Sequence, residues 1–158
     1  MTWNEIDFEK ALWTIPSTRT KNKKSHTVPL SPAALQILKT LPHLGHSEFV
    51  FAARGNDEHS VSGFSKAKRR LDKAVRFADW TLHDLRRSAA TGMAAQGTPP
   101  HVVEKILNHT SGTFGGVAGI YNQFKYVAEM REALERWATQ VAHAVLATQK
   151  STSSSETA

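Results

Sequence analysis

The chain contains no cysteine among its 158 residues. Disulfide bonds, thiolate nucleophiles and sulfur-ligated metal sites are therefore excluded, and the composition is compatible with a reducing compartment. A long apolar run is lacking as well, because charged or polar residues interrupt every hydrophobic stretch. No stretch has the pattern of a secretory signal or a membrane span, which predicts a soluble, cytoplasmic protein.

Acidic residues are in short supply: 14 Asp and Glu stand against 20 Lys and Arg, for a formal net charge of +6. A positive balance suits a polyanionic partner such as nucleic acid, although many proteins with such a charge bind none. There is no carboxylate cluster to hold Mg²⁺ and no helix-paired histidine spacing typical of a metal hydrolase, so we expect neither metal nor cofactor. The length and an apolar content of 40% predict one globular domain.

The first thirty residues predict a small antiparallel sheet. Residues 3–6, 11–15 and 26–30 have strand character, and polar turns separate them. The second turn is strongly basic, with Arg19, Lys21, Lys23 and Lys24 close together. Such a turn can be a solvated hairpin tip whose lysines protect a sheet edge, or a surface that contacts a phosphate backbone.

Helices are predicted from there onward. Ser31 followed by Pro32 favours a helix start, and residues 60–78 form a second, amphipathic helix after a buried segment at 48–52 and a loop at 54–59. This second helix carries six basic residues, and we identify as candidate DNA-binding residues Lys66, Arg69, Arg70 and Lys73, together with Lys23 and Lys24. A basic helix face is often merely solvated, but it also suits backbone contacts to DNA.

A helix opening at Thr81 is the most informative stretch. Thr81 can cap it, Asp84 suits the third helical position, and an apolar row of Leu82, Leu85 and Ala89 orients the polar side chains. His83 and Arg86 lie three residues apart, so they share a face in the first turns, where the helix dipole favours an anion. On spacing alone this pair is more often a solvated face than a phosphate site.

Two more helices follow. Gly97 can end the central helix, and residues 99–107 form the next one with its apolar side buried. Asn108 then tolerates a left-handed backbone and presents His109, which is by itself an ordinary histidine. After the glycine-rich stretch 110–119 comes Tyr121, and residues 127–146 have the pattern of a long amphipathic helix. The Ser/Thr-rich tail, residues 150–158, is predicted to be disordered.

These motifs together resemble the tyrosine recombinases of the phage integrase type. That family carries a His-x-x-Arg, then a Leu-Gly-His, then a nucleophilic Tyr at about the spacing found here for His83, Arg86, His109 and Tyr121. The segment 3–7, Trp-Asn-Glu-Ile-Asp, and the lysine-bearing turn are similar as well, so the resemblance spans most of residues 2–140. It implies a mainly α (α+β) catalytic domain of the DNA breaking-rejoining type over residues 1–149.

The resemblance also implies roles. Tyr121 would attack a DNA phosphodiester and form a 3′-phosphotyrosyl intermediate, Arg86 and His109 would bind the non-bridging oxygens, and His83 would exchange the tyrosyl proton. Lys21 matches the lysine that protonates the leaving 5′ oxygen, although Lys23 and Lys24 are close enough to be the general acid instead. Double-stranded DNA would be the partner, with self-association through the C-terminal helix and a tetramer on DNA, in a bacterial, prophage or mobile-element setting.

The chain departs from the family in one important respect. The first catalytic Arg of the family precedes the segment that matches residues 3–7, and here the sequence begins at Met1, without that Arg and without the N-terminal core-binding domain. We therefore expect a fragment of a recombinase with little or no activity alone. A non-catalytic DNA-binding or regulatory remnant of the same fold is the main alternative, and a type IB topoisomerase is a third reading.

Overall fold

The computed structural model describes residues 1–53, 55–75, 77–109 and 124–155. Near the N-terminus, β1 (Ile6–Asp7), β2 (Leu12–Ile15) and β3 (His26–Pro29) form an antiparallel sheet in that order, with Trp13 opposite Val28. The predicted sheet is confirmed, but its first strand is shorter than expected. Residues Trp3–Glu5 form a 3₁₀ turn, η1, because the Glu5 carboxylate turns back to accept from the backbone N–H of Thr2 at 3.1 Å.

Helix α1 (Pro32–Thr40) contributes one side to the first core. The predicted cap is confirmed, since the Ser31 hydroxyl oxygen accepts from the backbone N–H of Ala34 at 3.3 Å. The buried residues of this core are Ile6, Leu30, Leu38 and Val50, of which Leu38 comes from α1. The N-terminal sheet therefore has a core of its own, separate from the one that holds the later helices.

Residues 52–60 differ from the prediction. The expected loop at 54–59 is largely strand: β4 (Ala52–Ala53) pairs antiparallel with β5 (Asn56–Ser60). Val50 is buried as predicted, whereas Phe51 is 48% exposed. Between the two strands Gly55 adopts φ +80°, a conformation that glycine readily takes, and such a short pairing leaves no apolar pattern in the sequence.

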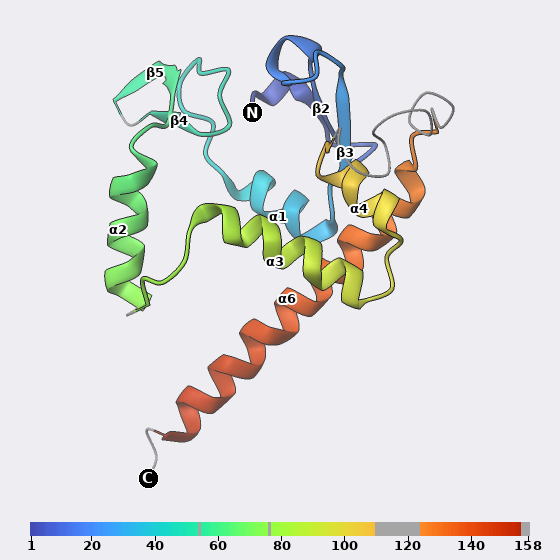
Figure 1. The fold of residues 1–158 in the computed structure, drawn as a ribbon. Helices are drawn as coiled ribbons and strands as arrows, with labels where there is room; N and C mark the ends of the chain where they lie inside the picture. The colour runs from blue at the N-terminus through green and yellow to red at the C-terminus, as the bar shows by residue number, and fades with distance from the viewer. Residues whose placement is uncertain (54, 76, 110–123, 156–158) are drawn as a thin grey trace.

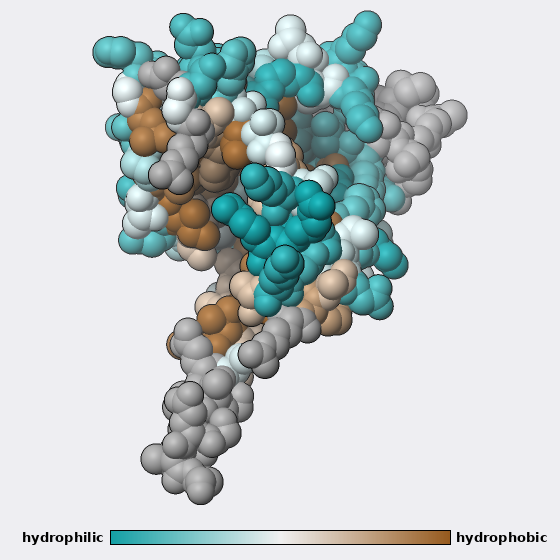
Figure 2. Space-filling model, turned by 90° about the vertical axis from the view of Figure 1, so that its left-hand side faces the viewer, coloured by the Kyte–Doolittle hydropathy of each residue, from teal (hydrophilic) through white to brown (hydrophobic). Residues whose placement is uncertain are grey.

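Helix α2 (Phe64–Val75) stands to one side of the body (Figure 1). It is amphipathic as predicted, yet the apolar residues Phe64, Leu71 and Val75 are each about half exposed or more, at 59%, 46% and 52%. Figure 2 shows the face of the molecule on which α2 lies, and there hydrophobic side chains are exposed beside hydrophilic ones. The apolar face of α2 is therefore not covered by the described residues.

Helix α3 (Leu82–Ala95) begins at the predicted cap and ends before Gly97, which adopts φ +80°. Its buried side differs from the predicted apolar row. Leu82 and Leu85 are 49% and 59% exposed, while Met93, in the last turn of the helix, is 1% exposed. Burial follows the C-terminal half of α3 because α4 and α6 pack there.

Helices α4 (Pro100–Ile106) and α6 (Val127–Ser155) complete the second core, in which Met93, Val103 and Ala133 are buried. Figure 1 shows α6 passing the body and extending well beyond it. Its predicted apolar stripe is accordingly buried at Met130 and exposed at Val145. The helix continues to Ser155, beyond the point where the sequence predicts a disordered tail. Within the described ranges, no helix is long and apolar enough to cross a membrane.

Candidate active site

A cleft of about 650 Å³ lies where the basic turn after β2, the start of α3 and the end of α4 meet. Four of the five predicted catalytic residues line it: Lys21, His83, Arg86 and His109. The other lining residues are Ile15, Arg19, Thr20, Asn22, Leu107 and Asn108. Among these described lining residues, none carries a carboxylate, so the cleft has the cationic and polar character that suits a phosphate group.

The start of α3 holds His83 and Arg86 in place. Thr81 and Asp84 form a reciprocal capping box, in which the Thr81 backbone N–H donates to Asp84 Oδ2 at 2.9 Å. The hydroxyl and backbone N–H of Thr81, with Arg87, lower the pKa of the Asp84 carboxyl below its ordinary value. The Asp84 carboxylate thus binds the helix cap and forms an ion pair with Arg87 at 3.0 Å. Its ion pair is with Arg87 and not with the neighbouring Arg86.

The C-terminal end of α4 is the second fixed element of the site. A helix end leaves its last carbonyl groups without partners inside the helix. Here each one receives a donor: backbone N–H groups serve the carbonyls of Val103, Glu104 and Lys105, His26 Nε2 serves Ile106 at 3.3 Å, and Arg86 serves Leu107. Two of the donors are side chains from other elements, so the α4 end is tied to both β3 and α3.

Asn108 takes the conformation that the sequence predicts. Its φ is +52°, in the left-handed region that Asn tolerates better than most non-glycine residues. The next backbone N–H, of His109, then returns to the Glu104 carbonyl at 3.0 Å. This tight ending of α4 leaves the His109 side chain exposed at the cleft.

The basic turn after β2 supplies Lys21 to the cleft. Lys23 and Lys24 are exposed in the same turn but are not among the residues that line the cleft. Arg19 also borders it, and its guanidinium pairs with Glu5. Burial alone would raise the pKa of Glu5, but hydrogen bonds from Trp13, Thr2 and Arg19 lower it below the ordinary value, so this carboxylate stays charged.

His26 is a site residue that the sequence did not single out. It is half-buried on β3, and because a carbonyl only accepts, Nε2 carries the hydrogen that bonds the Ile106 carbonyl. Burial lowers the pKa of His26 below 6.5, the Ile106 hydrogen bond opposes this, and the positive charges of Lys105 and Arg86 lower it further. No local pattern in the sequence marks it, since 80 residues separate the two partners.

We expect His26 to make stability fall on acidification. The unfolded state takes up a proton at the ordinary pKa of 6.5 while the folded state resists it, so stability decreases as the pH drops through 6.5 toward the folded pKa. His26→Gln removes the titrating group and keeps an N–H donor. The melting temperature of the unsubstituted chain should therefore drop more between about pH 7.5 and about pH 5 than that of His26→Gln. Equal drops would contradict this role of His26.

The predicted DNA-binding residues of α2 lie on the surface. Lys66, Arg69, Arg70 and Lys73 are all exposed. Lys68 on the same helix differs, because it pairs with Asp72 at 2.9 Å and lies 4.6 Å from the centre of the Trp80 ring. The exposed four are therefore available to a polyanion, whereas Lys68 fixes the end of α2.

Tyr121, the predicted nucleophile, lies outside the described residues. The described chain resumes at Phe124, whose ring centre is 4.9 Å from that of Tyr126. Tyr126 in turn lies 4.8 Å from the His101 ring of α4. The three aromatic rings place the start of α6 beside α4. In the parts of the chain that the structure describes, no group of three or more His, Asp or Glu residues is arranged to hold a metal ion.

The molecule is thus a mainly helical domain with small antiparallel sheets and a cleft lined by basic and polar side chains. The model of the phage integrase family matches residues 1–126. The chain therefore belongs to the phage integrase family, that is, to the tyrosine recombinases.

Individual relatives agree with this assignment. The chain is 34% identical over 137 residues to the prophage integrase IntA of Escherichia coli K12, an alignment that covers 86% of this chain and 32% of the relative. It is 32% identical over 141 residues to the integrase of Shigella phage Sf6 and to the prophage integrase IntS of Escherichia coli K12, covering 87% of this chain and 36% of each relative. The chain thus spans about a third of these relatives' length. No solved structure gives a significant match.

Proposed function

We propose that this chain carries the catalytic centre of a site-specific recombinase that cuts and rejoins double-stranded DNA through Tyr121. The observation that carries the proposal is the cleft, in which Lys21, His83, Arg86 and His109 meet from three separate elements. The prophage and phage integrases that the chain resembles support the same reading, and they suggest a bacterial or phage-borne element as its source.

The proposed reaction is a transfer of a DNA phosphoryl group to Tyr121. The phenolic oxygen attacks phosphorus, the bond to the 5′ oxygen breaks, and a 3′-phosphotyrosyl ester forms with the bond energy kept for rejoining. Tyrosine has a pKa of about 10, so it needs cationic neighbours or a base to react at neutral pH. His83 is the proposed acceptor of its proton.

Arg86 and His109 are the proposed binders of the transferred phosphate. Arginine offers a planar pair of donors that matches two phosphate oxygens and remains charged. Arg86 uses one of its five N–H groups on the Leu107 carbonyl, which orients the guanidinium and leaves the others for an anion. His109, at the α4 end, would donate to the same oxygens in the transition state.

Lys21 is the proposed acid that protonates the departing 5′ oxygen. Its place among the cleft residues favours it over Lys23 and Lys24, which sit in the same turn outside the cleft lining. The exposed α2 residues Lys66, Arg69, Arg70 and Lys73, together with Lys23 and Lys24, are proposed to contact the DNA backbone. Such contacts would make binding strongly dependent on salt.

We propose weak activity for these 158 residues alone. The family has a further arginine in the phosphate site, and Arg19, the other arginine that borders the cleft, is already paired with Glu5. Loss of one transition-state donor typically lowers the rate by a factor of about 10²–10³. A covalent assay that accumulates product over hours is therefore the appropriate one.

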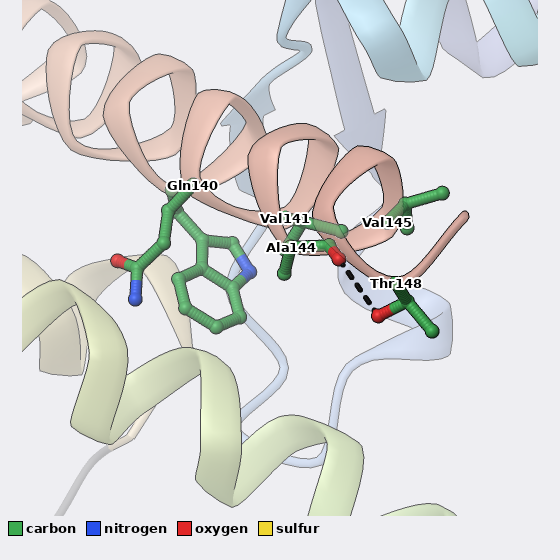
Figure 3. A pocket seen from close by; sticks show the side chains of 6 residues that line it. Gln140, Val141, Ala144, Val145 and Thr148 are labelled. Atoms are coloured by element: carbon green, nitrogen blue, oxygen red, sulfur yellow. Dashed lines mark hydrogen bonds between the residues drawn. The ribbon is translucent and has the colours of Figure 1, made fainter. Parts of the chain in front are cut away.

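The outer half of α6 is the proposed surface for self-association. Side chains of Trp137, Gln140, Val141, Ala144, Val145 and Thr148 line a shallow hollow of about 460 Å³. Figure 3 shows the last five of them on one stretch of the helix. Val141 and Val145 are 42% and 52% exposed there. An apolar stripe of this kind on an extended helix suits a second copy of the chain, in line with a tetramer assembled on DNA.

Tyr121→Phe tests the proposal. Incubation with a pool of random-sequence duplexes, followed by denaturation and detection of DNA bound covalently to protein, should give an adduct for the unsubstituted chain and none for Tyr121→Phe. Digestion and mass spectrometry should locate the nucleotide on Tyr121. Tyr126→Phe is the matched control, because Tyr126 is the other of the two tyrosines, and it should keep the adduct.

Two results would count against this function. An adduct that survives in Tyr121→Phe would remove Tyr121 as nucleophile. Salt-sensitive DNA binding with no covalent adduct from any variant would favour the non-catalytic DNA-binding remnant instead.

A further inference from the structure

The turn that carries Lys21 is closed by its own hydrogen bonds. The Thr20 hydroxyl donates to the Lys24 carbonyl at 2.8 Å, and the Lys23 backbone N–H donates to the Thr20 carbonyl at 3.2 Å. Lys21 therefore sits in a turn that is closed on itself by two hydrogen bonds. The position of Lys21 in the cleft then depends on the contact that joins this turn to the rest of the site.

One side-chain contact does so from within the turn. Asn22 Nδ2 donates to Asn108 Oδ1 at 3.0 Å, joining residues that are 86 positions apart. The orientation of the Asn22 amide is fixed independently, because its Oδ1 accepts from the Lys24 backbone N–H at 3.1 Å. Both asparagines are half-buried, so the bond is partly shielded from competing water.

We propose that Asn22 and Asn108 are positioning residues that hold the Lys21 turn at the phosphate cleft. The inference rests on the proposed function and extends it to two residues that act through Lys21 rather than on the substrate. Asn108 joins the two halves of the site, because its backbone ends α4 just before His109 while its side chain anchors the turn.

The choice of residue at position 108 supports this assignment. At φ +52° a glycine would be free of strain, and the related motif usually has glycine there. Glycine would end the helix equally well but has no oxygen to accept from Asn22. Asparagine satisfies the backbone and the contact together, whereas an alanine would satisfy neither.

Pyridoxal 5′-phosphate provides a probe that needs no knowledge of the DNA target. Its phosphate suits the Arg86 side of the cleft, and its aldehyde condenses with a nearby lysine amine to an imine, with loss of water. Borohydride then supplies a hydride and converts the imine to a stable secondary amine. Peptide mass spectrometry of the 158-residue chain gives the share of label on each lysine, and inorganic phosphate serves as competitor.

Three variants and one control separate the possibilities. Asn22→Ala and Asn108→Gly each remove one partner, and the double variant removes both. Asn4→Ala is the control, since Asn4 is exposed and lies outside the cleft lining. Labelling of the exposed Lys73 on α2 provides the internal reference.

The unsubstituted chain should label Lys21 above Lys73, and phosphate should suppress that excess. Asn22→Ala and Asn108→Gly should lower the Lys21 share about fivefold, the factor that one neutral hydrogen bond typically contributes. The double variant should lose no more than either single one, and Asn4→Ala should keep the excess. Because two unrelated structural defects would add in the double variant, equal losses in the single and double variants are specific to the contact.

The two ways to fail are distinguishable. If Lys21 is labelled selectively and phosphate competes, but the variants leave its share unchanged, the positioning role is wrong and the phosphate cleft stands. If the unsubstituted chain shows no phosphate-sensitive excess on Lys21, the cleft itself does not bind a phosphate beside Lys21, and the proposed function is overturned together with this inference.

Discussion

Arg86→Ala is expected to lower the rate of adduct formation by a factor of about 10²–10³, the usual cost of removing one donor to a developing phosphate charge. The guanidinium lines the cleft and is oriented by the Leu107 carbonyl, so its remaining N–H groups are available to the phosphate oxygens. Arg86→Lys should recover little, because an ammonium group cannot donate to two oxygens in the same planar geometry. The measurement is the covalent adduct assay with Tyr121 as the attached residue.

Arg87→Ala is the matched control for Arg86. The two residues are adjacent on α3, but the Arg87 side chain is 73% exposed, pairs with Asp84 and is not part of the cleft lining. An exposed ion pair of this kind contributes little to stability. Similar losses of rate in the two variants would mean that charge on the α3 surface, rather than a phosphate contact by Arg86, supports the reaction.

Gly92→Ala is expected to destabilise the fold, against the usual effect of this substitution. A Cβ at position 92 would lie 2.1 Å from Cζ3 of Trp137 and 2.6 Å from its Cε3, so α3 and α6 could not keep their present spacing. Overpacking typically costs about 1–3 kcal/mol. In a chain of this size each kcal/mol lowers the melting temperature by about 2–4 °C.

Whether Gly92→Ala raises or lowers the stability tests the packing of α6 on α3. In a helix with room for the methyl group, glycine to alanine stabilises by about 0.5–1 kcal/mol. Making that room with Trp137→Leu should therefore remove most of the penalty of Gly92→Ala, as measured by thermal denaturation of the four combinations. A Gly92→Ala chain that melts higher than the unsubstituted chain would show that α6 does not dock on α3 through Trp137.

Local chemistry made much of the fold predictable. The caps at Ser31 and Thr81, the helix end at Gly97 and the left-handed Asn108 each depend on one residue and its immediate neighbours, and each appears as predicted. The grouping of His83, Arg86 and His109 was expected from the family motif. Their shared lining of one cleft agrees with that expectation, while their chemical roles remain proposals.

What the sequence did not reveal depends on packing between distant segments. Leu85 belongs to the predicted apolar row of α3, but it is exposed because α4 and α6 pack on the other end of α3. The strand at Asn56–Ser60 has no apolar alternation to mark it. His26 and Asn22 were missed for the same reason, since their partners are far along the chain and no periodicity links them.

The α4 end explains how a basic turn and two helices come to form one site. Its last two carbonyls accept from His26 of β3 and Arg86 of α3, and the Asn108 side chain accepts from Asn22 of the turn. Donors near a helix C-terminus also complement the negative end of the helix dipole. Acceptor groups that a short helix leaves over at its end thus bind Arg86 and the turn of Lys21, two parts of the site that the proposed chemistry needs.

A crystal structure of the chain grown in sulfate would test the central claim most directly. We predict one sulfate in the cleft, bound by the Arg86 guanidinium and by the imidazoles of His83 and His109, with the Lys21 amine within reach of it. A cleft that stays without an anion while sulfate binds the exposed basic residues of α2 would contradict the catalytic assignment and leave a basic helical module of the same family.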